Sequence, residues 1–133
     1  MPYNFNGQDV DINNITLQHL LDGIIGEGSP KSYSINVTNN GSGAYNLSGN
    51  DRNGSVSGNN ATVNINVGDN ITFNVNASGH PFWIKTSAIT GIENAVSGVT
   101  NNGSQNGFVS WTPTSDGTYY YICQYHGSMN GII

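Results

Sequence analysis

The chain has 133 residues, the size of one ordinary domain, and a net charge of −5 at pH 7. Only 8% of its residues are charged, and its three basic residues, Lys31, Arg52 and Lys85, stand far apart in the sequence. So few cations cannot form a basic patch, and we exclude nucleic acid as a partner. No apolar run reaches the roughly 18 residues that a membrane helix needs, so we expect no membrane span.

Residues 1–30 differ in pattern from the rest of the chain, and we interpret them as a helical extension followed by a linker. Apolar residues recur at helical spacing between residues 13 and 25, which predicts one short amphipathic helix. This extension is expected either to pack on the remaining domain or to mediate self-association. Neither a basic n-region nor an apolar segment typical of a signal peptide is visible. The apolar positions are Leu17, Leu20, Leu21, Ile24 and Ile25.

Residues 31–133 change to an alternation of period two, which is typical of half-buried antiparallel strands. Ile71, Phe73 and Val75, for example, alternate with Thr and Asn. Short strands separated by Asn-Gly pairs predict an all-β fold, a Greek-key β-sandwich that carries the short N-terminal helix. The predicted strands are 33–37, 61–67, 71–77, 82–85, 108–111, 118–123 and 131–133. The predicted Asn-Gly turns are 40–41, 53–54, 102–103, 106–107 and 130–131.

The aromatic residues are interpreted mainly as core. Tyr119 and Tyr121 alternate inward along the predicted strand 118–123, and one of them is expected to form a tyrosine corner. Trp83 and Trp111 are also predicted to lie in the core, because large aromatic side chains dominate protein interiors.

The residues that can carry chemistry gather near the C-terminus. Cys123, the only cysteine, is followed at intervals of three residues by His126 and Met129, and His80 lies in a turn after another predicted strand. One thiolate, two imidazoles and a weak thioether are the donors of copper electron-transfer sites. Zinc would accept several of these donors, but a thioether is a poor zinc ligand. Such close spacing lets three donors converge only if a tight loop follows the strand.

The segment GTYxYxCxxHxxM at residues 117–129 resembles the C-terminal copper-binding motif of the cupredoxins, the plastocyanin, azurin and amicyanin family. The resemblance extends over roughly residues 33–133 and identifies residues 31–133 as a cupredoxin-like copper-binding domain. It implies that His80, Cys123 and His126 are equatorial ligands of one copper ion and that Met129 is the axial ligand. It implies no catalytic residue. The sequence departs from the family at Tyr125, where many members have proline.

The resemblance implies a type 1, blue-type copper protein that transfers one electron by cycling between Cu(II) and Cu(I), and not an enzyme. It implies that electrons enter and leave the copper ion through the exposed ring edge of His126, and that a redox partner protein docks near His126 and Tyr125. It also implies a location outside the cytoplasm, periplasmic or secreted, and association with a virion is the second possibility.

Three other functions stay open. The Asn-, Gly- and Ser-rich composition and the N-terminal extension are compatible with a structural or interaction domain, in a virion or outside cells, that binds copper without acting as a soluble carrier. The segments GHPF at residues 79–82 and YYICQYH at residues 120–126 resemble domains found in marine microbial and phage sequences. Copper storage or delivery is another alternative. A fragment of a multicopper enzyme is disfavoured, because only His19 is spare and we expect it to have no functional role.

Overall fold

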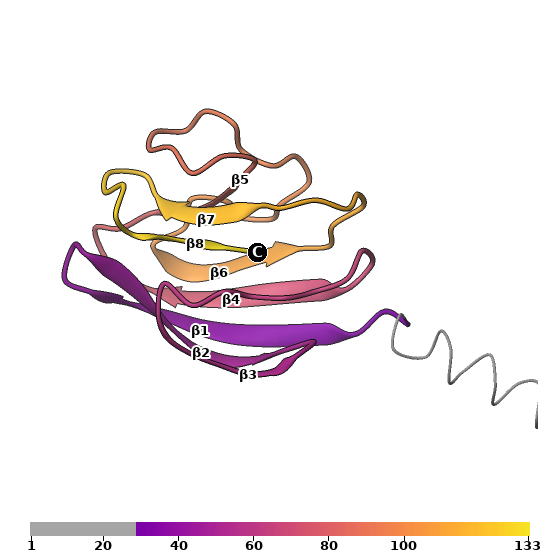
Figure 1. Cartoon of the computed structure of the whole chain (residues 1–133). Helices are drawn as coiled ribbons and strands as arrows, with labels where there is room; N and C mark the ends of the chain where they lie inside the picture. Colours follow the sequence, from indigo (N-terminus) through magenta and orange to yellow (C-terminus); the bar gives the residue numbers. More distant parts are fainter. Residues whose placement is uncertain (1–28) are drawn as a thin grey trace, which may run out of the picture.

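The computed structural model describes residues 29–133, which form two packed β-sheets without a helix (Figure 1). No helix in this part of the chain is long and apolar enough to cross a bilayer. The predicted N-terminal helix and His19 lie outside the described residues. The strands are β1 (Ser32–Asn40), β2 (Ala44–Asp51), β3 (Gly54–Asn59), β4 (Asn70–Asn76), β5 (Phe82–Lys85), β6 (Asn106–Trp111), β7 (Tyr120–Cys123) and β8 (Asn130–Ile132).

The larger sheet has the strand order β3-β2-β1-β4-β6, and the smaller sheet has the order β5-β7-β8. All neighbouring strands are antiparallel except β1 and β4, which run parallel. Figure 1 shows β5 and β7 on the opposite side of the molecule from β1, β2 and β3. The prediction of an all-β sandwich is confirmed.

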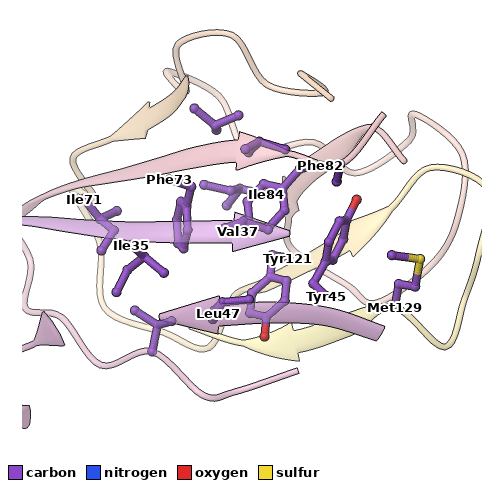
Figure 2. Close-up of a cluster of buried hydrophobic side chains, with 14 of the residues drawn as sticks. Ile35, Val37, Tyr45, Leu47, Ile71, Phe73, Phe82, Ile84, Tyr121 and Met129 are labelled. Carbon is purple, nitrogen blue, oxygen red and sulfur yellow. The ribbon is translucent and has the colours of Figure 1, made fainter. Parts of the chain in front are cut away.

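The alternating apolar residues of the two sheets form one core between them (Figure 2). The parallel register places Ile35 beside Phe73 and Val37 beside Val75, so that all four side chains share one face of the larger sheet. From the smaller sheet, Tyr121 stacks on Phe82 with ring centroids 5.3 Å apart. Burying each such side chain contributes about 1.5–3 kcal/mol, which makes this core the main source of stability.

The prediction of a strand at 61–67 is wrong. Ala61, Val63 and Ile65 do alternate in burial with polar neighbours, which is the pattern that suggested a strand. The backbone hydrogen bonds of the segment, however, go to separate partners: Val63 N donates to Ile132 O (2.9 Å), and Asn64 O accepts from Arg52 N (3.0 Å). The segment is therefore an extended connection that bonds to residues near both sheets but does not pair with any strand.

Strands β2 and β3 were not predicted. They carry few apolar residues, because Asn, Ser and Gly fill most positions, and no alternation is visible in the sequence. The pairing of β2 with β1, and of β3 with β2, supplies the missing stability, since a tertiary partner overrides a weak local preference. Tyr45 and Leu47 of β2 are fully buried in the core.

Asn-Gly pairs mark turns at three of the five predicted places. The pair at 102–103 lies within a turn, Asn40-Gly41 opens the turn after β1 and Asn53-Gly54 closes the turn before β3, whereas Asn106-Gly107 begins β6 and Asn130-Gly131 begins β8. Gly131 is required for a different reason, because a Cβ there would overlap the ring and hydroxyl of Tyr121. The glycine at this position thus permits close packing and does not make a turn.

The predicted tyrosine corner is present at Tyr119, whose hydroxyl donates to Ser115 O at 3.0 Å. Its ring packs edge-on against Trp111, with centroids 4.9 Å apart. Trp111 and Tyr121 are buried as predicted. Trp83 is only partly buried and does not belong to the central core cluster, so the prediction for that residue is wrong.

Candidate metal centre

His80 lies in the turn that leads from the larger sheet to the smaller one. The turn follows the buried Ala77, whose carbonyl accepts the backbone N–H of His80 at 2.9 Å. Gly79 adopts a φ of +86°, a conformation that residues with a side chain rarely take. The Gln105 side chain accepts the N–H of Gly79. These bonds hold His80 at the edge of the core, where only 9% of its surface is exposed.

Cys123 is the last residue of β7 and is fully buried. The chain then makes a short loop that two backbone hydrogen bonds close: Met129 N donates to His126 O (3.1 Å), and Cys123 N donates to Met129 O (2.9 Å). The loop returns His126 to the thiol, as the three-residue spacing predicted. Neither Gly127 nor Gly131 has a positive φ, so this closure does not depend on left-handed glycine.

Three potential ligand atoms converge in this region. Cys123 Sγ lies 3.5 Å from Nδ1 of His126 and 3.7 Å from Nδ1 of His80. One ligand atom from each of these residues lies within 4.8 Å of the others, and the two imidazole centroids are 4.9 Å apart. A metal–sulfur bond of about 2.3 Å and metal–nitrogen bonds of about 2.0–2.1 Å, spread around one ion, separate sulfur from nitrogen by roughly 3.6–3.8 Å. The donor set and its dimensions therefore fit a single metal ion.

Met129 occupies the inner side of the closing loop. Its side chain is fully buried and belongs to the core cluster, while its backbone is bonded to that of Cys123. Figure 2 shows Met129 at the same end of the core as Tyr45. Its role as an axial ligand stays a prediction.

Burial shapes the electrostatics of the site. Desolvation lowers the pKa of His80 below its ordinary value, and the neighbouring His126 lowers it further. The ring is therefore neutral at pH 7, the form in which an imidazole binds a metal. Burial also raises the pKa of Tyr45, and the nearby Cys123 adds to that rise, so this phenol stays protonated.

The loop that contains Gly91 packs beside the loop between Cys123 and Met129, which carries His126. Gly91 N donates to Gln124 O at 2.8 Å, and the side chain of Gln124 accepts from Trp83 Nε1 at 3.0 Å. Gln124 N donates to Pro81 O (3.0 Å), which links the Cys123 and His80 segments directly. Both sides of the site are thereby tied to each other through Gln124.

One residue of this region, Tyr45, was not predicted from the sequence. It is fully buried, and its hydroxyl donates to the backbone oxygen of His80 at 2.7 Å. Nothing in the sequence near Tyr45 indicates this contact, because 35 positions separate the two residues and the strand itself was not predicted. Of the residues that were singled out, His80, Cys123 and His126 are brought together, and Tyr125 lies beside them with 63% of its surface exposed.

No family model matches the chain, and no curated protein matches it. Among solved structures, the fold is similar to that of the copper protein rusticyanin, with a TM-score of 0.50 and 22% identity over 79% of this chain and 78% of the other. A structure of rusticyanin from Thiobacillus ferrooxidans matches with a TM-score of 0.46 and 22% identity over 79% of this chain and 77% of the other. At 22% identity, the match with a TM-score of 0.50 shows a shared fold, the cupredoxin fold, and the fold alone.

Proposed function

We propose that the protein is a type 1 copper protein that carries one electron at a time, with His80, Cys123, His126 and Met129 as the ligands of one copper ion per chain. The observation that carries this proposal is the convergence of Nδ1 of both histidines on the Cys123 thiol. Two nitrogens and one thiolate with a weak thioether are the donors of blue-copper centres, in which bound copper alternates between Cu(II) and Cu(I).

The surrounding residues favour electron transfer over catalysis. His80, Cys123 and Met129 have at most 9% of their surface exposed, so a substrate has little access to these three ligands. The backbone bonds at Ala77, His126 and Met129 hold the ligand segments before a metal arrives. A site that is formed in advance changes little between two oxidation states, and this keeps the reorganisation on electron transfer small. We therefore propose no enzymatic activity.

We propose that a redox partner docks on the face formed by Ile89, Ile92, Tyr125 and His126. The first three side chains are 45%, 59% and 63% exposed, which is high for large apolar residues. The loop that carries Ile89 and Ile92 is bonded to Gln124 through Gly91, so it lies next to His126. An apolar face of this kind indicates a protein partner with its own apolar face, and charge attraction would contribute little.

The decisive experiment is an optical titration of the full chain with Cu(II), with and without the Cys123→Ser substitution. We expect an intense thiolate-to-copper band that reaches its maximum at one equivalent and bleaches reversibly on reduction. The band should be absent in Cys123→Ser and unchanged in His19→Ala, the matched control that removes the spare histidine. A weak band that persists in Cys123→Ser would refute the proposal and favour a structural domain of the same fold.

The proposed location is outside the cytoplasm. Cytoplasmic thiol buffers compete for copper, so a carrier with a single Cys123 thiolate ligand is better suited to the periplasm, the secreted fraction or a virion. Fractionation of the native source, followed by detection of the protein, tests this location. Recovery only with cytoplasmic proteins would contradict it.

A further inference from the structure

Tyr45 is the buried polar residue near the site to which no role has yet been given. It lies on β2, in the larger sheet, whereas Cys123 ends a strand of the smaller sheet. Its ring is fixed in the core by Phe82, with centroids 5.1 Å apart and the planes at 65°, and by Tyr121 at 6.1 Å. With the ring held in this way, its hydroxyl oxygen lies beside the backbone oxygen of His80 and near the side chain of Cys123.

The hydroxyl donates to the backbone oxygen of His80 at 2.7 Å, and this bond is buried. The N–H of the same residue donates to Ala77 O. The peptide groups on both sides of the His80 Cα are thus held, one from within the turn and one by Tyr45 on β2 of the larger sheet. Two fixed peptide groups determine where the Cβ of His80 lies, and so limit the positions that its Nδ1 can reach.

We infer that Tyr45 is a positioning residue for the metal centre: its hydroxyl holds the backbone of His80 so that Nδ1 faces the thiol of Cys123. The inference rests on the proposed function. Groups that orient metal ligands through hydrogen bonds commonly change metal affinity by about 10–100-fold when they are removed. Here the bond goes to the backbone of the ligand residue, so it fixes the position of the whole ligand and leaves its tautomer free.

The chain offers a matched control in Tyr121. Its hydroxyl also donates to a backbone oxygen, that of Ala61, at 2.6 Å, and its ring belongs to the same aromatic cluster. Ala61 lies in the extended connection and not in a ligand segment. Tyr45→Phe and Tyr121→Phe each remove one buried O–H from the same core and leave the ring in place. Any general loss of stability is therefore common to both variants.

Two readouts on the full chain test the inference. The first is hydrogen exchange of the His80 amide in the metal-free protein, corrected for global stability, and we expect it to rise at least about tenfold in Tyr45→Phe and less than about twofold in Tyr121→Phe. The second is the copper dissociation constant, which should rise about tenfold in Tyr45→Phe and stay within about twofold in Tyr121→Phe. A shifted thiolate-to-copper band should appear in Tyr45→Phe alone.

Equal effects of the two variants on both readouts would overturn the inference. So would a Tyr45→Phe chain that fails to fold in a stabilising sucrose buffer in which Tyr121→Phe folds, since the role would then be one of fold stability. Failure of the proposed function gives a different result. In that case the wild-type chain shows no thiolate-to-copper band at all. The comparison of His80 amide exchange in the metal-free variants still decides whether Tyr45 holds the backbone of His80.

Discussion

Arg52 and Asp69 form an ion pair that is almost fully withdrawn from solvent, with Nη2 and Oδ1 2.9 Å apart and side-chain exposures of 9% and 0%. Asp69 also accepts the backbone N–H groups of Lys31 (3.0 Å) and Asn66 (2.8 Å). The carboxylate therefore ties three segments together just before β4. His80 follows the same strand, so the ion pair and the metal centre lie at opposite ends of β4.

Replacing Asp69 by Asn should destabilise the fold by about 2–4 kcal/mol without changing the proposed copper site. The substitution removes the buried counter-charge of Arg52, and breaking a buried pair from one side is strongly unfavourable. Urea unfolding of the metal-free chain measures the loss. Asp116→Asn is the control, since Asp116 is exposed, and it should stay within about 0.5 kcal/mol of the wild type. Equal midpoints for the two variants would contradict the prediction.

The same carboxylate predicts a loss of stability in acid. The hydrogen bonds from Arg52, Asn66 and Lys31 hold the pKa of Asp69 at about 2, below the ordinary 3.8. A lowered folded-state pKa stabilises the fold above pH 3.8, and this contribution of about 2 kcal/mol is lost as the pH falls from about 4 to 2. Unfolding free energies at several pH values should show this drop in the wild type. If Asp69→Asn declines equally steeply over this interval, other carboxyl groups are responsible.

Lys85 should anchor the loop that carries the proposed docking face. Its side chain is fully buried, and Nζ donates to Ile89 O at 2.9 Å and to Gly91 O at 2.6 Å. Lys85→Met keeps the length of the side chain but removes both donors, so the loop is expected to loosen. Exchange of the Gly91 amide should accelerate at least tenfold, whereas Lys31→Met, an exposed control, should leave it unchanged. Unaltered exchange in Lys85→Met would contradict this role.

Gly131→Ala should cost about 1–3 kcal/mol, because an added Cβ would overlap the Tyr121 ring in a packed core. The appropriate control is Gly43→Ala, where the nearest atom to a new Cβ is Asn40 O at 3.9 Å. Thermal unfolding should show a clear decrease in midpoint for the first variant and almost none for the second. Indistinguishable midpoints would show that Tyr121 can move aside without cost.

Met129→Leu should retain copper and raise the reduction potential. The thioether is expected to be a weak axial donor that stabilises the oxidised ion, and the axial ligand tunes the potential of such sites. Because Leu and Met have similar volumes, the fold should lose less than about 1.5 kcal/mol. Cyclic voltammetry beside the wild type measures the shift. An unchanged potential would show that Met129 is only a core residue.

Much of the site could be predicted from the sequence, since its donors are chemically rare in this chain. The chain has one Cys, so few other residues could join it in a soft metal site. His126 and Met129 follow Cys123 at short intervals, so a single loop is enough to bring them close to it. The strand around Ile71 could also be predicted, because one face of β4 is buried and the other faces solvent, which gives alternating apolar and polar residues. Strand β2 could not be predicted from the sequence, because its composition is mostly polar and its stability comes from pairing with neighbouring strands.

By itself, the sequence determined the all-β class and the return of His126 to Cys123 through a tight loop, because these follow from local periodicity and spacing. Only the tertiary structure decided that residues 61–67 stay outside the sheets, that Gly131 makes room for Tyr121, and that Tyr45 reaches the backbone of His80. Each of these depends on which distant segments pack together. Such contacts arise from the burial of the whole core, and no short stretch of residues carries that information.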